Sequence, residues 1–189
     1  AQSPVHTLTW DAYGPVRIGL EGRNGSGKTT LLRALRGETT LASGTVEACV
    51  PVQSLDQTLA TLPEAMPALD WLAAQMQADA MDVPATRLAL LGLTGARARQ
   101  PLGRLSGGER MRVAIAAAAW AQPAAPLLLL DEPASHLDLD SVDALVALLR
   151  GWPGALVVVS HDPAVLDALA LTHRLHLDAN RLHLQPVDP

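Results

Sequence analysis

The chain has 189 residues, of which 49% are apolar and 17% are charged, and its formal net charge is −5. These values exclude a disordered chain and are typical of a folded domain with a substantial core. The acidic balance argues against a surface that coats a nucleic-acid backbone. The apolar runs are too short to span a bilayer, and the N-terminus lacks the features of a signal peptide. The single cysteine, Cys49, can form no internal disulfide, which fits a cytoplasmic protein.

The first predicted elements are strands and one helix. Alternating apolar and polar residues predict strands over residues 5–10, 16–20 and 45–53. A glycine-rich segment follows the second strand. A helix over residues 28–36 comes next, and Gly37 is placed to end it.

The middle of the chain has the character of a helical insertion. Helical patterning covers residues 67–78 and 84–91, and a proline is expected at the first position of each helix. We therefore expect a helical subdomain over residues 55–104. It would be inserted into a core formed by residues 1–54 and 105–189.

The remaining elements predict a mainly parallel sheet with a small antiparallel edge. Short, continuous apolar runs are typical of buried parallel strands, and helical patterns separate them here. The tail alternates on both sides of a turn and predicts a hairpin. The fold class is therefore expected to be α/β. The expected elements are a helix over 106–120, a strand over 127–130, a helix over 140–150, a strand over 155–159, a helix over 163–169 and a hairpin over 173–184.

A phosphate-binding loop follows the second predicted strand. Its glycines let the backbone approach phosphates, and its N–H groups and the helix N-terminus form an anion site. Lys28, the only lysine of the chain, would reach the β- and γ-phosphates, and the Thr29 hydroxyl would bind Mg²⁺. The loop reads Gly22-Arg23-Asn24-Gly25-Ser26-Gly27-Lys28-Thr29, and Thr30 follows it.

Two carboxylates end the apolar strand over residues 127–130. The carboxyl ends of parallel strands are where α/β sheets bind ligands. Asp131 would hold Mg²⁺ through water, and Glu132 can polarise an attacking water molecule. A solvated acidic strand end is the alternative interpretation. The phosphate loop upstream favours the functional one.

A serine and two glycines open the helix predicted over residues 106–120. The N–H groups of such a helix start form a second anion site. Ser106 and Glu109 also have the spacing of a capping box, and both interpretations can hold together. The segment reads Leu105-Ser106-Gly107-Gly108-Glu109.

These three motifs, in this order, resemble those of the ATP-binding cassette (ABC) family. The phosphate loop resembles Walker A, Asp131 and Glu132 resemble the end of Walker B, and residues 105–109 resemble the family signature. The resemblance implies a P-loop NTPase fold with a RecA-like core, and an ATPase that uses ATP and Mg²⁺. It also implies that Glu132 is catalytic.

Other residues resemble further motifs of the family. Gln53 resembles the Q-loop glutamine, which contacts Mg²⁺ and the γ-phosphate, and Gln57 is a second candidate. Asp138 ends a segment, residues 135–138, that resembles the D-loop. His161 resembles the switch histidine, which senses the γ-phosphate, and is expected to be catalytic.

In this family the site is shared between two cassettes. The signature of one cassette caps the ATP held by the other, so one chain supplies two half-sites. The resemblance therefore implies a second cassette as partner, either in the same full-length chain or as a homodimer. Direct membrane insertion is not expected.

Several details resemble the ABC-F branch, whose members lack transmembrane domains and in many cases act on ribosomes. Glu109 stands where transporters usually carry glutamine, and residues 131–138 resemble the branch's D-E-P-T-N-H-L-D. Ala134, Ser135 and Pro163 depart from the branch pattern.

The sequence resembles the second cassette of a longer protein. Any contact with a ribosome would then come through parts outside this chain. The aromatic residue that stacks on adenine in the family is expected some way upstream of Trp10, in a part of the longer protein that this sequence does not include. The alternative is the nucleotide-binding domain of an ABC transporter.

Overall fold

The computed structural model describes residues 9–56, 59, 62–121, 126–135, 137–178 and 181–187. Its centre is a six-stranded sheet with the strand order β2-β3-β4-β1-β5-β6. All neighbouring strands are parallel except β5 and β6, which form an antiparallel hairpin at one edge. The predicted α/β class and antiparallel edge are therefore confirmed. The strands are β1 (Arg17–Glu21), β2 (Val52–Asp56), β3 (Leu127–Asp131), β4 (Ala155–Val159), β5 (His173–Asp178) and β6 (Arg181–Pro186).

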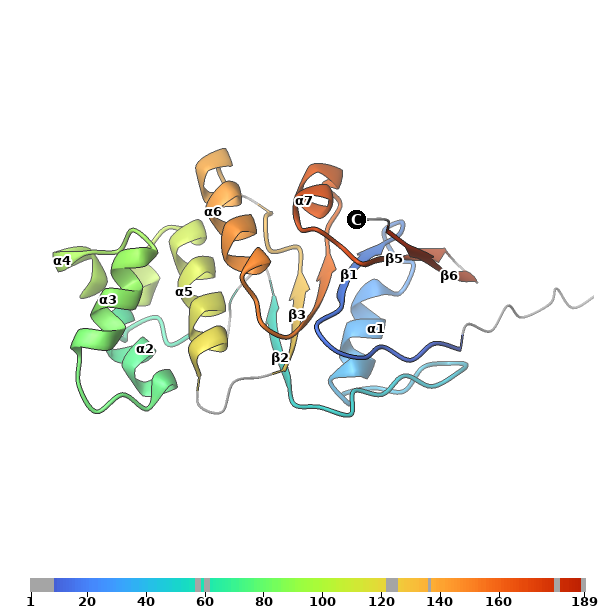
Figure 1. Cartoon of the computed structure of the whole chain (residues 1–189), viewed down its shortest axis with the longest axis horizontal. Helices are drawn as coiled ribbons and strands as arrows, with labels where there is room; N and C mark the ends of the chain where they lie inside the picture. The colour runs from blue at the N-terminus through green and yellow to red at the C-terminus, as the bar shows by residue number, and fades with distance from the viewer. Residues whose placement is uncertain are drawn as a thin grey trace, which may run out of the picture.

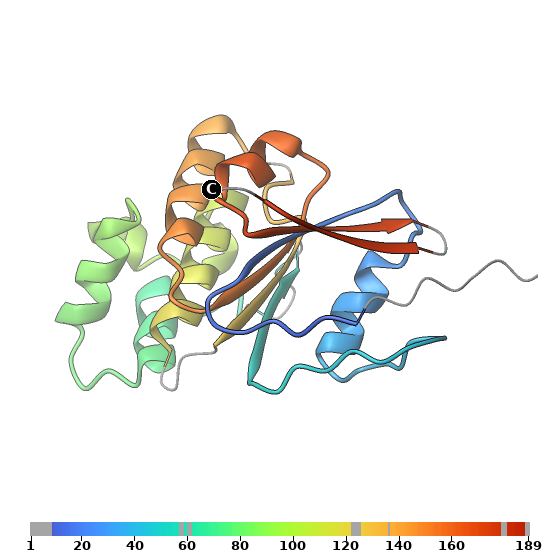
Figure 2. The same cartoon turned by 45° about the vertical axis from the view of Figure 1, so that its right-hand side comes forward.

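Helices cover both faces of this sheet, as two views at 45° to one another show (Figures 1 and 2). Helix α1 lies on one face, and α5, α6 and α7 lie on the other. Crossover helices are what connect parallel strands, so this layering follows from the parallel order. The helices are α1 (Lys28–Leu35), α2 (Ala68–Met76), α3 (Asp82–Leu90), α4 (Gly95–Ala98), α5 (Gly107–Trp120), α6 (Leu139–Arg150) and α7 (Pro163–Ala168), with a 3₁₀ turn at Leu102–Arg104.

The four leucines of β3 show why the strand is a continuous apolar run. Leu127 and Leu129 pack with Leu32 of α1, whereas Leu128 and Leu130 belong to the cluster on the other face. Successive side chains of a strand point to opposite faces, so a strand covered on both sides needs apolar residues throughout. This burial fixes the strand whose end carries Asp131.

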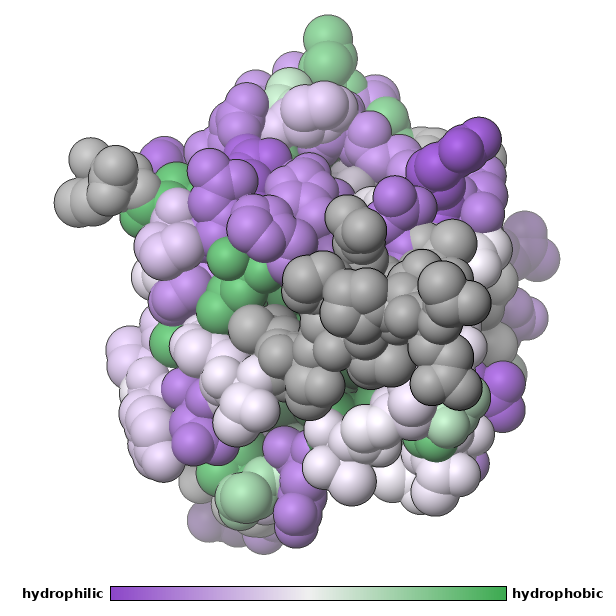
Figure 3. Space-filling view, turned by 90° about the vertical axis from the view of Figure 1, so that its right-hand side faces the viewer, coloured by the Kyte–Doolittle hydropathy of each residue, from purple (hydrophilic) through white to green (hydrophobic). Residues whose placement is uncertain are grey.

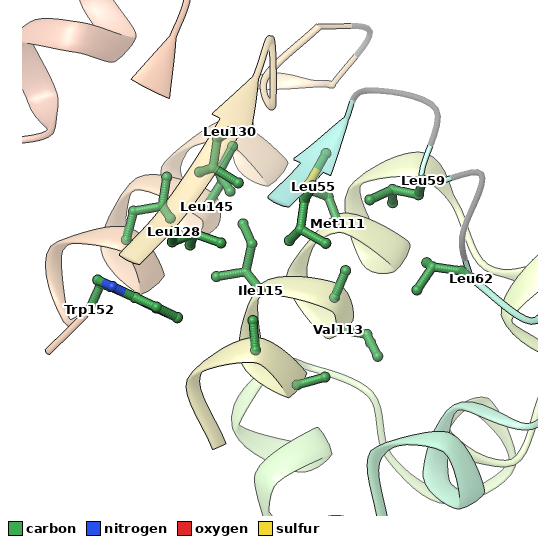
Figure 4. Packing of buried hydrophobic residues seen from close by; sticks show 14 of the residues in the cluster. Leu55, Leu59, Leu62, Met111, Val113, Ile115, Leu128, Leu130, Leu145 and Trp152 are labelled. Atoms are coloured by element: carbon green, nitrogen blue, oxygen red, sulfur yellow. The ribbon is translucent and has the colours of Figure 1, made fainter. Parts of the chain in front are cut away.

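Helices α2, α3 and α4 lie beyond α5, away from the sheet (Figure 1). Their buried side chains, such as Leu72 and Leu88, belong to the same apolar cluster as Ile115 of α5. Figure 4 shows α5 between this region and the strands β2 and β3, with Ile115 directed toward Leu128. Helix α5, whose N-terminus carries the signature residues, is therefore packed on both sides.

Three local predictions differ from the structure. The strand predicted over 45–53 begins only at Val52, because Pro51 has no N–H to donate to a ladder and β2 pairs only with β3. Pro67 is the N-cap residue of α2, and Pro84 is the third residue of α3, so neither occupies the first helical position. Of the strand predicted over 5–10, residues 5–8 lie outside the described residues, and Thr9 and Trp10 are not in a strand.

The end of the molecule that carries α1 and the β5–β6 hairpin is shown as a space-filling view (Figure 3). Hydrophilic side chains gather over its upper part, and apolar ones show as small patches among paler residues. Within the described ranges, no helix is long and apolar enough to cross a bilayer.

Candidate nucleotide-binding site

The phosphate loop joins the end of β1 to the start of α1. Gly22 has a φ of 151°, and a Cβ there would lie 2.2 Å from the carbonyl oxygen of Leu177 in β5. Gly27, the N-cap residue of α1, is left-handed with a φ of 104°. Only glycine meets both requirements without strain, so the motif's spacing has a direct structural cause here.

Lys28, the only lysine of the chain, is buried although its side chain is charged. Its exposed fraction is 8%, and its Nζ donates to the carbonyl oxygens of Gly22 at 2.7 Å and Arg23 at 3.1 Å. A buried cation needs oxygen partners, and these carbonyls belong to the loop itself. Lys28 therefore places a positive charge under a concave loop that also ends at a helix N-terminus.

Thr29 and Asp131 bring the loop and the end of β3 together. The Thr29 hydroxyl donates to Oδ2 of Asp131 at 3.2 Å. A hydroxyl and a carboxylate oxygen are ligands of the kind that Mg²⁺ prefers. Two of the three predicted metal-binding residues thus adjoin, and their chemistry fits that ion.

Glu132 follows β3 in a strained backbone conformation. Its φ is 51°, a left-handed value that costs a non-glycine residue about 1–3 kcal/mol. The surrounding hydrogen bonds hold it there: its N–H donates to Val159 O at 3.0 Å, and its carbonyl accepts from the N–H and hydroxyl of Ser135 at 3.1 and 2.8 Å. Strain of this kind clusters at functional sites, because it aims a side chain that a relaxed turn would not.

The Glu132 side chain faces His161, which follows β4. Nε2 of His161 lies 3.4 Å from Oε1 of Glu132, and the backbone N–H of His161 donates to Oε2 at 3.4 Å. Oε1 is buried and accepts no hydrogen bond from the described residues. A buried carboxylate oxygen with spare acceptor capacity can take a proton from water.

The two predicted catalytic residues share a cavity with the phosphate loop. The cavity has a volume of about 700 Å³, which suits a small-molecule ligand. Of the predicted loop residues, Gly22, Arg23 and Ser26 do not line it, and Gly22 and Arg23 contribute the carbonyls that hold Lys28. The lining residues are Asn24, Gly25, Gly27, Lys28, Thr29, Thr30, Asp131, Glu132, Val159 and His161.

Gln53 is not brought to this cavity. It is the second residue of β2 and pairs in register with Leu128, whereas Asp56 pairs with Asp131. Gln53 was expected directly after a strand, and that placement is wrong because β2 begins later than predicted. At about 3.3 Å per residue, three residues put it about 10 Å back from the strand end. The second candidate, Gln57, comes next after β2 in the sequence and lies outside the described residues.

The signature residues form a separate cluster at the start of α5. Ser106 is the N-cap residue, and its side chain accepts from Glu109 N while Glu109 accepts from Ser106 N, which confirms the predicted capping box. Leu105 is buried, and Ser106 and Gly107 are exposed. None of residues 105–109 lines the cavity beside Lys28.

Gly108 marks a close approach of α5 to α6. A Cβ there would lie 2.5 Å from the Ser141 hydroxyl oxygen. Ser141 is held in turn by Asp138, the N-cap residue of α6, whose carboxylate accepts from Ser141 N at 2.7 Å. These hydrogen bonds lower the pKa of the exposed Asp138 carboxyl. The structure thus places the D-loop residue close to the signature rather than in the cavity beside Lys28.

Arg97 is a residue of this cluster that the sequence did not indicate. Its guanidinium binds both carboxylate oxygens of Glu109, at 2.9 and 2.5 Å. These hydrogen bonds are the main reason why the pKa of Glu109 is lowered to about 2. The pair joins residues on two helices, and no local pattern signals it.

Comparison with known sequence families finds one that matches more than half of the chain. Residues 5–135 match the sequence family described as ABC transporter. This match spans all three of the central motifs, from the phosphate loop to Glu132.

Known proteins with similar sequences are several times longer than this chain. The "Probable ATP-binding protein YheS" of Haemophilus influenzae is 41% identical over 79% of this chain and 24% of its own length. The ABC transporter F family member 3 of Arabidopsis thaliana is 38% identical over 80% of this chain and 21% of its own length. The chain thus spans about a quarter of the length of these relatives.

Solved structures show the same fold. A metal-chelate type ABC transporter in an inward-facing conformation is 27% identical, with a TM-score of 0.76 over 95% of this chain and 75% of that one. A dimeric bacterial ABC transporter cassette is 21% identical, with a TM-score of 0.73 over 95% of this chain and 89% of that one. The predicted P-loop NTPase fold is confirmed.

Proposed function

The chain belongs to the ABC transporter family, and on that premise we propose that it is an ATP-binding cassette that hydrolyses ATP. The observation that carries the proposal is the meeting of Lys28, Asp131, Glu132 and His161 around one cavity. A buried cation beside a helix N-terminus binds phosphate, and a carboxylate at the same cavity can activate water. The organisation we propose is a RecA-like core with an inserted helical subdomain that ends at residue 104. Its first boundary lies after residue 56 and not after residue 54 as expected, because Leu55 and Asp56 pair with β3 in the core sheet.

Within this site we assign the phosphates to the loop of residues 22–30. Thr29 and Asp131 would hold Mg²⁺, with Asp131 acting through water. The bound ion would offset phosphate charge and orient the β- and γ-phosphates. The adjoining oxygens of the two side chains, 3.2 Å apart, support this assignment.

We assign proton transfer to Glu132 and sensing of the terminal phosphate to His161. Glu132 is placed to accept a proton from the attacking water, because its Oε1 is buried and accepts no hydrogen bond from the described residues. His161 lies 3.4 Å from that oxygen and can sense the terminal phosphate while it orients the carboxylate. For the Q-loop role we propose Gln57 in place of Gln53, because Gln57 directly follows the strand end.

We propose that the working unit contains a second cassette. The signature residues lie outside the cavity that contains Lys28, so one chain holds two separate half-sites. Ser106 and Gly108 would cap ATP bound to the partner, and the partner's equivalents would complete this chain's site. Removal of the γ-phosphate would then loosen the pair, as in other nucleotide switches.

The branch we favour is ABC-F, in a cytoplasmic protein. One support is the similarity to a relative named as an F family member, and another is Glu109 in the signature. Ribosome contact would fall to other parts of a longer chain. The likeness to a metal-chelate type transporter supports the alternative of a transporter cassette. Co-purification of the full reading frame with ribosomes favours the first, and co-purification with a membrane-spanning partner favours the second.

The decisive test of hydrolysis is the Glu132→Gln substitution. The variant should bind ATP like the parent chain and release no phosphate. Glu47→Gln serves as a matched control, because Glu47 is exposed and does not line the cavity beside Lys28. Phosphate release by the Glu132→Gln variant at the parent rate would refute the assignment of Glu132.

A further inference from the structure

Glu109 places a negative charge where the proposed function needs an anion to bind. Its carboxylate lies at the N-terminus of α5 and accepts from Ser106 N at 2.7 Å. In the proposed function, on which this inference rests, Ser106 and Gly108 receive the triphosphate of a partner cassette. An uncompensated carboxylate this close would repel that triphosphate, because like charges near a protein surface interact strongly.

Arg97 supplies the compensating charge in a fixed geometry. Its Nε donates to Oε1 of Glu109 at 2.9 Å, and its Nη2 donates to Oε2 at 2.5 Å. Two parallel N–H donors match a carboxylate and hold it in one orientation, which a lysine cannot do. The same Oε2 accepts from Ser106, so the guanidinium and the signature backbone share one oxygen.

Arg97 is itself fixed by the region that contains α2 and α4. Its Nη1 donates to Oε1 of Gln100 at 2.7 Å, and the Gln100 carbonyl accepts from Ala68 N at the start of α2 at 3.0 Å. A continuous series of hydrogen bonds therefore runs from α2 to the N-cap of α5. A shift of the helical region would move the carboxylate at the signature.

We propose that Arg97 is a positioning residue for the partner's nucleotide: it neutralises and orients Glu109 so that the N-terminus of α5 can receive a triphosphate. Arg97 does not touch the nucleotide in this account. It acts on the half-site that serves the other cassette, and leaves the chain's own cavity unchanged.

The test uses the chain with Glu132→Gln, which retains ATP in the proposed function. The measurement is the dimer dissociation constant at saturating Mg-ATP, from sedimentation or light scattering. Arg97→Met should weaken pairing about tenfold or more, with the affinity of each chain for ATP unchanged. Adding Glu109→Gln to Arg97→Met should restore most of the pairing, because it removes the charge that needed compensation.

The unchanged ATP affinity separates a positioning role from a merely structural one. If Arg97 only stabilised the fold, its loss would weaken ATP binding by each chain as well as pairing, whereas the proposal expects a change in pairing alone. Arg99→Met is the matched control, since Arg99 is exposed and forms no ion pair among the described residues. It should pair like the parent. Arg97→Lys keeps the charge without the planar fork and should give intermediate pairing, which provides a second reading if Arg97→Met folds poorly.

If the parent pairs, two results would overturn the proposal: pairing of Arg97→Met as tight as the parent, or a double variant as weak as Arg97→Met. If the parent binds no ATP, the proposed function fails, and this inference fails with it for that separate reason. If the parent binds ATP but stays monomeric, hydrogen exchange decides. Arg97→Met should then speed exchange of the amides of residues 106–110 about tenfold and leave those of α1 unchanged. Exchange at residues 106–110 that is no faster in Arg97→Met than in the parent would overturn the proposal.

Discussion

The Thr29 hydroxyl donates to Asp131 Oδ2 at 3.2 Å, although 102 positions separate the two residues in the chain. The sheet order explains the contact. Strands β1 and β3 are parallel with only β4 between them, so the loop after β1 and the end of β3 reach the same edge. This edge is where open α/β sheets bind their ligands.

The first prediction concerns the metal dependence of ATP binding. Thr29→Val keeps the shape of the side chain and removes its oxygen. We expect it to raise the Mg²⁺ concentration needed for half-maximal ATP binding about tenfold, a typical result of losing a ligand or its support. Titrating Mg²⁺ at fixed ATP measures this. Thr40→Val, at an exposed threonine away from the cavity, should leave the midpoint where it is.

The second prediction separates the two candidate glutamines. Gln57→Ala should slow ATP hydrolysis, because Gln57 follows the strand whose last residue pairs with Asp131. Gln53→Ala should leave the rate unchanged, because Gln53 pairs with Leu128 and does not line the cavity. Steady-state phosphate release from both variants, side by side, gives the answer. A slower rate for Gln53→Ala and an unchanged rate for Gln57→Ala would instead assign the Q-loop role to Gln53.

The third prediction concerns the close approach of α5 and α6. Gly108→Ala places a Cβ 2.5 Å from the Ser141 hydroxyl oxygen and should lower the free energy of unfolding by about 1–3 kcal/mol. Gly107→Ala is the matched comparison, because its Cβ would meet only Leu137 at 3.9 Å. Urea unfolding of both variants measures the difference. Equal stability would mean that the two helices can separate at no cost.

The fourth prediction is a pH dependence of stability from Glu109. Its pKa is lowered from 4.5 to about 2, chiefly by the hydrogen bonds from Arg97. A lowered carboxyl pKa stabilises the fold above the unfolded-state value, and that contribution disappears as pH falls from about 4.5 toward 2. The stability difference between the parent chain and Glu109→Gln should therefore shrink over that interval. A difference that stays constant from pH 6 to pH 3 would contradict it.

Much of the nucleotide site could be predicted because its motifs are contiguous. Gly22 and Gly27 are required by backbone angles, and Lys28 directly follows Gly27 and reaches back to the carbonyl oxygen of Gly22. Leu127 and Leu128 belong to a run that is typical of a strand buried on both faces, and the structure has such a strand there. Such constraints act within a few residues, so spacing alone reveals them.

The remaining features depend on contacts between distant segments. Val46, Ala48 and Val50 alternate like a strand, yet they line a hollow beside the end of α1, outside the sheet. Because of this alternation, a strand was predicted over residues 45–53, with Gln53 at its end. The strand β2 instead begins at Val52, so Gln53 lies near its start. The pairing of Arg97 with Glu109 requires α4 to lie against α5, which no local pattern specifies.

The most direct test of the account is calorimetric titration of the Glu132→Gln chain with Mg-ATP, with and without Lys28→Ala. We predict that the Glu132→Gln chain binds one nucleotide per chain and that Lys28→Ala abolishes this binding, because Lys28 supplies the charge beneath the phosphate loop. Circular dichroism would confirm that both variants are folded. Unchanged ATP affinity in a folded Lys28→Ala variant would contradict the assignment of the cavity as the nucleotide site.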